Sequence, residues 1–289
     1  MADNSINTSS ELSSQLSLDD FEIGRILGRG RFGVVFRGRH IESRDLVAIK
    51  VIRNDQIDEL DMYNQLEEEI VIQSNLKHEN IVQLYAYFHD DSRHFLVMEL
   101  ADCGSLAELL RQSHRFDSAR AAFYLRQVID AVVYCHDQDV IHRGLKLENI
   151  LLAERELIKV ADFGWSVKRV PGIRRRTICG TIECLAPEML NEEPYDFSID
   201  VWAVGVLLYE FLVGYGPFAA ELLSDTIDLI RNVQYDFPEG FPDGAKEIVS
   251  NLLVENPDNR VALSEVLTTN WMITESRAFE ERLEPTDRS

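Results

Sequence analysis

The chain has 289 residues, of which 45% are hydrophobic and 27% are charged, proportions typical of a globular protein. Its formal net charge of −21 argues against nucleic acid as a partner, because contacts to phosphates need basic surface. No membrane partner is expected either, since the longest apolar run, residues 201–209, is about half of a membrane span and the N-terminus lacks a signal-peptide pattern. The four cysteines lack the spacing of a zinc site or a redox pair, so reduced thiols in a cytosolic or nuclear protein are expected.

The first third of the chain has the composition of a sheet. Residues 1–20 are polar and acidic, and we expect a disordered tail there. From residue 21 onward, short runs rich in valine, isoleucine and phenylalanine predict antiparallel strands. The predicted strands are residues 21–27, 33–40, 46–52, 81–88 and 94–100. A predicted helix, residues 62–75, interrupts them, with Leu66, Ile70 and Ile72 on its inward side.

The rest of the chain has helical character. Ser105 and Asp117 are predicted N-caps of two helices. Residues 198–213 are apolar nearly all round, as a buried helix should be. This order of elements predicts an α+β fold with two lobes, and by itself it leaves the function open. The expected segments are a β-rich N-lobe at 21–101, a helical C-lobe at 102–272 and a C-terminal tail at 273–289.

The first motif is a glycine-rich turn with the sequence GRGRFG at residues 28–33. Alone it is weak, because dinucleotide-binding turns share the pattern. A dinucleotide-binding turn opens a helix, however, whereas the strand formers Val34, Val35 and Phe36 follow here. Strand, glycine turn and strand are typical of the loop that covers the ATP phosphates in protein kinases, and this interpretation is favoured.

The second motif is a lysine within an apolar strand, Lys50 in the sequence VAIKVI. A lysine in such surroundings is costly unless it is paired. In kinases it holds ATP phosphates and pairs with a glutamate of a nearby helix. The candidates are Glu67, Glu68 and Glu69, and Glu69 is preferred because Leu66, Ile70 and Ile72 mark the inward side.

Three further motifs follow in order. Residues 142–149, HRGLKLEN, match the kinase catalytic loop at every signature position except residue 144. The triplets DFG at 162–164 and APE at 186–188 come after it at suitable intervals. Asp162 and Asn149 are expected to bind Mg²⁺, which commonly takes a few protein oxygens together with nucleotide phosphates. Five ordered motifs together predict a protein kinase fold.

The tryptophan after the DFG triplet makes the sequence similar to the Aurora family of serine/threonine protein kinases in particular. The resemblance spans about residues 18–274 and is carried also by DFEIGR at 20–25, YFHD at 87–90, YEFLVG at 209–214 and RRTICGT at 175–181. It implies transfer of the ATP γ-phosphoryl group to serine or threonine, with ATP and Mg²⁺ as cofactors.

The resemblance also assigns roles to single positions. The residues that match the ATP site are Leu27, Gly28, Gly30, Phe32, Gly33, Val35, Ala48, Lys50, Glu69, Glu99, Ala101, Asn149, Leu151 and Asp162. Asn149 and Asp162 match the metal ligands. Lys146, Asn149 and Thr181 match the catalytic and substrate-aligning residues, and Gly144 stands at the position of the catalytic base. Thr177 matches the activating phosphothreonine, with Arg143 and Arg175 as its expected ligands.

Two structural roles follow from the same resemblance. Glu188 and Arg260 match an ion pair of the C-lobe, and Asp200 matches the aspartate that anchors the catalytic loop.

Two departures from the Aurora pattern bear on activity. Glu68 stands where Auroras place an arginine that helps to hold the phosphothreonine. Gly144 replaces the aspartate that accepts the proton of the substrate hydroxyl. Two hypotheses therefore stand: an Aurora-like kinase impaired by Gly144, or a pseudokinase that binds ATP and acts as a scaffold or regulator of mitotic partners.

The resemblance has consequences for partners and location. It implies protein substrates with an arginine upstream of the target residue, received by Glu148. It also implies an activator protein on the N-lobe, with the chain acting as a monomer or in a heteromeric complex. The expected location is cytoplasm and nucleus, at the spindle, centrosome or centromere during mitosis.

Overall fold

The computed structural model describes residues 16–30, 33–60, 62–170, 172, 175–177 and 179–283. The chain divides into two compact units. Among these residues, the first unit contains residues 16–77 and 82–102, and the second contains residues 78–81 and 103–283.

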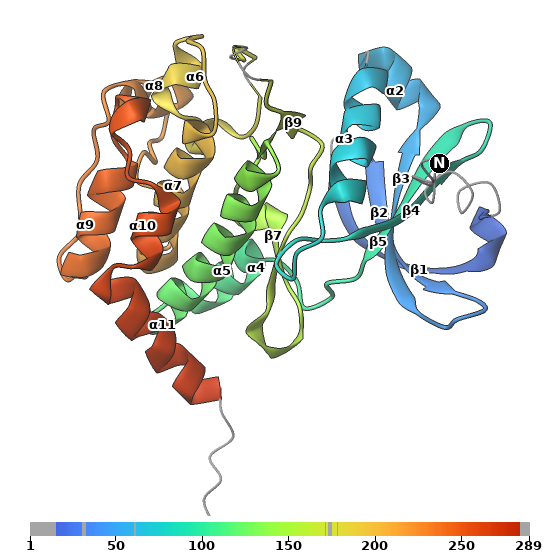
Figure 1. The fold of residues 1–289 in the computed structure, drawn as a ribbon, viewed down its shortest axis with the longest axis horizontal. Coiled ribbons are helices and arrows are strands. Elements are labelled where there is room, and N and C mark those ends of the chain that lie inside the picture. Colours follow the sequence, from blue (N-terminus) through green and yellow to red (C-terminus); the bar gives the residue numbers. More distant parts are fainter. Residues whose placement is uncertain are drawn as a thin grey trace, which may run out of the picture. The chain divides into compact units, whose positions relative to one another are not determined.

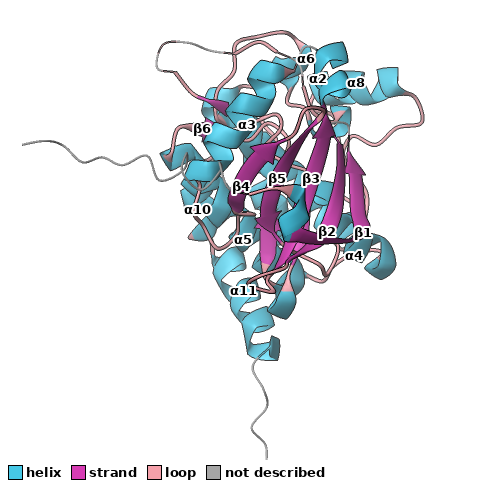
Figure 2. Ribbon diagram, turned by 90° about the vertical axis from the view of Figure 1, so that its right-hand side faces the viewer, coloured by secondary structure: helices cyan, strands magenta, loops and turns pink. Residues whose placement is uncertain are grey.

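The first unit is built on a five-stranded antiparallel sheet with the strand order β1-β2-β3-β5-β4 (Figure 2). Two helices accompany the sheet. The elements are η1 (Leu18–Asp20), β1 (Phe21–Gly30), β2 (Gly33–His40), β3 (Leu46–Arg53), α2 (Asn54–Leu60), α3 (Tyr63–Asn75), β4 (Leu84–His89) and β5 (Arg93–Glu99). The predicted strands and the predicted helix are thus present, with ends that differ by a few residues.

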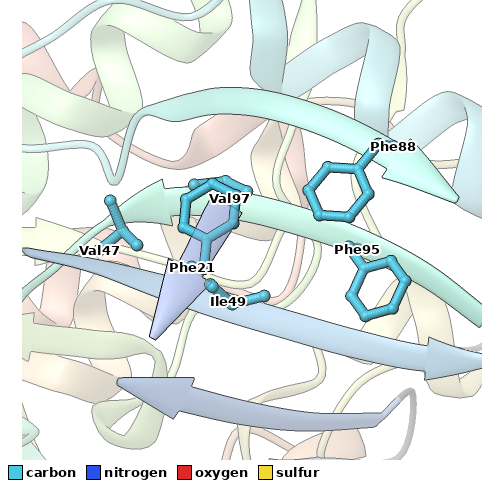
Figure 3. Packing of buried hydrophobic residues seen from close by; sticks show 6 residues of the cluster. All are labelled: Phe21, Val47, Ile49, Phe88, Phe95 and Val97. Carbon is cyan, nitrogen blue, oxygen red and sulfur yellow. The ribbon is translucent and has the colours of Figure 1, made fainter. Parts of the chain in front are cut away.

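The two faces of this sheet bury different clusters. One face packs the side chains shown in Figure 3: Phe21, Val47, Ile49, Phe88, Phe95 and Val97. Alternate residues of a strand point to opposite faces. Ile52 accordingly lies in a second cluster with Leu66 of α3 and Leu96 of β5. Lys50 lies two residues before Ile52 in β3, so its side chain points to the same face of the sheet, on which α3 packs.

The second unit is mainly helical, with two short two-stranded sheets. Its helices are α4 (Leu106–Ser113), α5 (Ser118–Asp137), α6 (Pro187–Leu190), α7 (Ser198–Val213), α8 (Leu223–Arg231), α9 (Asp243–Leu252), α10 (Leu263–Leu267) and α11 (Asn270–Leu283) (Figure 1). Its strands are β6 (Val140–Ile141), β7 (Ile150–Leu152), β8 (Ile158–Val160) and β9 (Val167–Lys168), and its short 3₁₀ turns are η2 (Leu147–Asn149), η3 (Glu154–Glu156), η4 (Ile182–Cys184) and η5 (Pro257–Asn259).

The predicted helix starts of the second unit are confirmed. The Ser105 hydroxyl accepts a hydrogen bond from the Glu108 backbone N–H at 3.2 Å, and the Glu108 carboxylate accepts one from the Ser105 N–H. Asp117 accepts from the Arg120 N–H at 2.9 Å. Such caps satisfy N–H groups that lack partners at the start of a helix. The apolar run at 198–213 is helix α7, which is buried along most of its length.

The segment boundaries differ from the sequence-based expectation at three places. Leu16 and Leu18 pack against the Phe21 cluster, so ordered packing begins before residue 21. Ile81, expected in a strand of the first unit, instead bridges to Val160 of the second. The expected tail at 273–289 is helical through Leu283.

Helix α11 explains the last difference, because it has a partner. The rings of Phe279 and Phe123 of α5 lie 5.0 Å apart. Arg126 also pairs with Glu280 at 2.5 Å. The mixed α+β class is confirmed. Within the residues that the structure describes, no helix combines the length and apolar character that a membrane crossing needs.

Candidate active site

The glycine turn joins β1 to β2 on the first unit. Gly28 pairs with Val35, and Gly30 with Gly33. Gly33 has a φ of +142°, and a Cβ there would lie 2.2 Å from the Val51 carbonyl oxygen, so this position requires glycine. A Cβ on Gly28 or Gly30 would meet no described atom within 4 Å. Packing therefore does not account for these two glycines, whereas close approach of a ligand to bare backbone would.

Several other residues expected around the nucleotide lie on or near the same sheet of the first unit. Ala48 is buried in β3 and pairs with Met98, while Glu99 ends β5. Leu27, Val35 and Ala101 are half-buried, and Phe32 lies outside the described residues.

Lys50 forms a buried ion pair with Glu69. Its Nζ donates to the Glu69 Oε1 at 2.6 Å, and the two side chains are 10% and 5% exposed. Glu67 by contrast is exposed and Glu68 half-buried. A buried charge is tolerated when a close partner compensates its desolvation. The expected pairing of Lys50 with Glu69 is thus confirmed, because Glu69 is on the face of α3 that carries Leu66 and Ile72.

On the second unit, Asp200 of α7 anchors the loop that follows β6. Its two carboxylate oxygens accept from the backbone N–H groups of His142 and Arg143 at 2.8 and 2.9 Å. A third hydrogen bond joins it to His136 Nε2 at 2.9 Å. Burial alone would raise the pKa of Asp200, but these bonds and the neighbouring imidazoles together lower it. The expected anchoring role of Asp200 is confirmed.

The buried His142 ring connects the catalytic loop to the residues around the DFG triplet. Burial lowers the pKa of this histidine, so the ring is neutral near pH 7. Its Nδ1 then accepts from the Gly144 N–H at 3.2 Å, and its Nε2 donates to the Ala161 carbonyl at 3.3 Å. The Phe163 ring meets it edge to face at 4.8 Å. Residues 142–144 and the DFG triplet therefore hold each other in place.

Asn149 directly precedes β7, and Asp162 comes two residues after β8; because Ile150 pairs with Val160, both lie at the same end of this strand pair. Asn149 Nδ2 donates to the Gly144 carbonyl at 2.8 Å, which leaves the amide oxygen as the atom suited to a cation. The Ala161 N–H donates to the Asn149 carbonyl at 2.8 Å, so the residue before Asp162 is fixed to Asn149. Asp162 has a φ of +63°, a left-handed backbone conformation that residues with a side chain seldom adopt.

Among the described residues, no group of three or more histidines, cysteines or carboxylates is arranged to hold a metal. Asn149 and Asp162 suit instead a Mg²⁺ ion that keeps phosphate oxygens and waters as its other ligands. Leu151, the middle residue of β7, is half-buried and pairs with Lys159.

Lys146 and Thr181 are brought together by the second unit. The Lys146 Nζ donates to the Thr181 hydroxyl at 3.1 Å, although the two residues are 35 positions apart. This bond links the catalytic loop to the C-terminal end of the activation segment, which we define as residues 162–188.

Three carboxylates interact near this point. Burial, and then the negative charges of Glu148 and Glu183, raise the pKa of Glu210 to about 8. Glu210 lies in α7, whose apolar sequence predicts a buried helix and does not single out this carboxylate. An acidic residue within an apolar run, like Asp200 near the start of the same helix, is the signal that could have identified it.

The predicted phosphosite lies on an exposed stretch of the activation segment. Thr177 is exposed, and Arg175 is half-buried. The Arg143 side chain donates to the Trp165 carbonyl through Nε at 2.6 Å and to the Tyr195 hydroxyl through Nη1 at 3.0 Å. Tyr195 was not singled out from the sequence, because a lone tyrosine in a polar stretch carries no recognisable signal.

Comparison with known proteins decides the family. The protein kinase domain model matches residues 21–272. Mouse (Mus musculus) Aurora kinase C is 43% identical over 261 residues, which cover 90% of this chain and 94% of that protein. The chain is a protein kinase of the Aurora family.

Two further Auroras show the same relationship. Zebrafish (Danio rerio) Aurora kinase B is 44% identical over 92% of this chain and 82% of its own length. Xenopus laevis Aurora kinase A-B is 43% identical over 94% of this chain. This Aurora-family chain spans 66% of the length of that last relative.

Proposed function

We propose that this chain is a serine/threonine protein kinase of the Aurora type, with turnover reduced by glycine at position 144. The observation that carries the proposal is the state of the loop around Gly144. Asn149 Nδ2 donates a hydrogen bond to the Gly144 carbonyl at 2.8 Å, and Lys146 Nζ donates one to the Thr181 hydroxyl at 3.1 Å. The loss of the base is therefore local, and the surrounding framework for phosphoryl transfer remains.

The residues fit Mg²⁺-bound ATP. Gly28 and Gly30 expose backbone with no described atom where a Cβ would lie. The Lys50 ammonium is fixed by Glu69 and suits binding of phosphate oxygens. Asn149 and Asp162 supply two hard oxygen ligands for Mg²⁺. When bound, the metal neutralises charge that develops on the transferred phosphoryl group.

Side chains of this chain would position the substrate and stabilise charge during the transfer. Lys146, oriented by its hydrogen bond to Thr181, is positioned to stabilise negative charge near the acceptor hydroxyl. Asp200 holds the loop backbone so that this geometry is preset. At residue 144 no side chain accepts the hydroxyl proton, which removes general-base assistance worth about 10²–10⁴-fold.

The pseudokinase is the second candidate, and the observation in its favour is Gly144 itself. In that case ATP would stabilise a shape that partners recognise. The intact Lys146–Thr181 bond favours the kinase, because a scaffold has no physical need for a substrate-aligning pair.

The substrate class follows from charge. Glu148, Glu183 and Glu210 form an acidic group beside the catalytic loop, which suits a guanidinium of a protein substrate. We propose substrates with arginine upstream of the phosphorylated residue. From family membership we also propose an activator protein on the first unit, and mitotic action at spindle, centrosome or centromere.

Nucleotide binding is tested by thermal unfolding. Millimolar ATP with Mg²⁺ should raise the melting temperature, because a ligand that binds the folded state alone stabilises it by mass action. Lys50→Met and Asp162→Asn should each weaken this shift. A surface variant such as Lys246→Met, with its lysine exposed on α9, is the matched control and should keep the full shift. An unaltered protein without any shift would contradict ATP binding.

Kinase and pseudokinase are separated by transfer of label from γ-labelled ATP to an arginine-containing peptide. We expect slow transfer by the unaltered protein that disappears in Lys50→Met. ATP binding without transfer above the Lys50→Met background would instead support the pseudokinase.

Recognition of arginine should depend on pH. Since the pKa of Glu210 is about 8, this carboxyl is mostly protonated at pH 7 and ionised at pH 9. The KM for an arginine peptide should therefore fall as pH rises, by up to about tenfold over this interval if the ionised form binds. Glu210→Gln should remove this dependence, whereas Glu247→Gln at an exposed position of α9 should keep it.

The same carboxyl affects stability with a defined sign. Its pKa is higher in the folded protein than the ordinary glutamate value of 4.5, so the folded state retains a proton that the unfolded state loses. The contribution of Glu210 to stability should therefore fall as pH rises from about 4.5 to about 8.

The KM prediction has its own contradicting outcome. An identical pH profile of KM in Glu210→Gln and the unaltered protein would exclude Glu210 from arginine recognition.

A further inference from the structure

Tyr195 lies between α6 and α7 in the sequence and is 2% exposed, although residues 176 and 177 beside it are exposed. Its backbone pairs with Arg175 in an isolated antiparallel bridge. The Tyr195 N–H donates to the Arg175 carbonyl at 3.0 Å, and the Arg175 N–H donates to the Tyr195 carbonyl at 3.3 Å. Arg175 of the activation segment is thus held by two backbone hydrogen bonds to a buried residue.

The phenol of Tyr195 adds a second attachment. Its hydroxyl donates to the Thr177 carbonyl at 2.8 Å and accepts from Arg143 Nη1 at 3.0 Å. Burial raises the pKa of this phenol, against the opposing effect of Arg143, so the hydroxyl keeps the proton that it donates. A chain of hydrogen bonds therefore runs from Arg143 of the catalytic loop through Tyr195 to the backbone of Thr177.

Arg143 is itself held in place by other hydrogen bonds, so it can hold the Tyr195 hydroxyl in a fixed position. Its backbone N–H binds Asp200, and its Nε donates to the Trp165 carbonyl at 2.6 Å. The guanidinium cannot follow a movement of residues 175–177 without breaking its bond to Trp165. The contacts of the Tyr195 hydroxyl involve backbone and side-chain groups that are present before any modification of Thr177.

We propose that Tyr195 is a positioning residue that holds residues 175–177 of the activation segment against the catalytic loop without a phosphate on Thr177. The order of this segment is then built into the chain, and phosphorylation adds little to it. The inference concerns the conformation of the segment and does not require phosphoryl transfer, so an inactive protein tests it equally well.

Hydrogen exchange of the unphosphorylated protein, read by mass spectrometry over residues 175–177, provides the test. Tyr195→Phe removes the hydroxyl and keeps the ring. We expect exchange of the Arg175 N–H, which donates to the Tyr195 carbonyl, to rise about 5- to 10-fold, the equilibrium factor that corresponds to one lost hydrogen bond. Phosphorylation of Thr177 should change exchange less than twofold in the unaltered protein, and more in Tyr195→Phe, where Arg143 Nη1 has lost its bond to the phenol and can bind the phosphate.

Tyr209→Phe is the matched control, since the buried Tyr209 hydroxyl also donates to a backbone carbonyl, that of Asp236, at 2.8 Å. It should lower the melting temperature without affecting exchange at 175–177. Equal exchange in Tyr195→Phe and the unaltered protein would overturn the proposal, as would an equal rise in Tyr209→Phe. If Tyr195→Phe does not fold, Arg143→Gln removes the donor to the phenol and must raise exchange in the same stretch.

Discussion

Replacing Gly144 by aspartate is expected to raise kcat by about 10²–10⁴-fold, the usual contribution of a general base. This range corresponds to about 3–5 kcal/mol of activation free energy. An aspartate here would accept the proton of the substrate hydroxyl and orient that hydroxyl. The expectation depends on whether the loop has room for the new side chain.

The geometry at residue 144 allows the substitution. A Cβ would lie 3.6 Å from His142 Cε1 and Nδ1 and 3.7 Å from Asn149 Nδ2, which are ordinary van der Waals contacts. Gly144 is also not among the residues with positive φ, so a residue with a side chain fits its backbone. The loop bonds to Asp200 and Thr181 involve neighbouring residues and should persist.

The test compares kcat and KM for one arginine-containing peptide. Gly144→Asn is the matched control, because asparagine has nearly the size of aspartate and is not a base at neutral pH. We expect it to remain near the low rate of the unaltered protein. ATP affinity should change little in either variant. Equal kcat values for Gly144→Asp and the unaltered protein, at a rate normal for kinases, would show that another group supplies the base.

A Gly144→Asp protein that binds ATP and remains inactive would have a different meaning. The defect would then extend beyond residue 144, and the chain would act as a pseudokinase. The Lys146–Thr181 bond makes this outcome the less expected one.

Much of the fold follows from local sequence because several signals agree at the same residues. Valine and isoleucine at alternate positions predict β3. The alternation of side chains along this strand places Lys50 on the face of the sheet that packs against α3. Ser105 and Asp117 predict helix starts because their side chains can replace missing backbone partners. The pairing of Lys50 with Glu69 follows likewise from the apolar pattern of one helix.

Contacts between distant residues were harder to predict. The C-terminal residues of α11 are polar enough to suggest a tail, yet Phe279 finds a partner in α5 only when the whole unit folds. Ile81 continues an apolar run, but its bridge to Val160 assigns it to the second unit. Tyr195 and Glu210 gain their environments from residues far away in the sequence, so their properties depend on tertiary structure.

The buried pair of Arg260 and Glu188 is expected to be the most sensitive point for stability in the second unit. Two parallel hydrogen bonds join the guanidinium to the carboxylate, at 2.6 and 2.7 Å. The two side chains are 1% and 2% exposed. Arg260 also donates to the carbonyls of Ser198 at 2.9 Å and Val254 at 3.0 Å. Removing it leaves a buried carboxylate and two partly buried carbonyls without their donor.

Arg260→Ala should therefore lower the free energy of unfolding by about 3–5 kcal/mol, the usual cost of breaking a buried pair by deleting one partner. Arg282→Ala is the matched control, because Arg282 forms an ion pair with Asp117 at 2.8 Å while both side chains are more than half exposed. Its loss should cost about 0–1 kcal/mol. Urea unfolding of the three proteins measures both values. A double variant, Arg260→Met with Glu188→Met, should recover part of the loss, since no charge is then left buried. Equal destabilisation by Arg260→Ala and Arg282→Ala would show that the buried pair does not contribute as its geometry indicates.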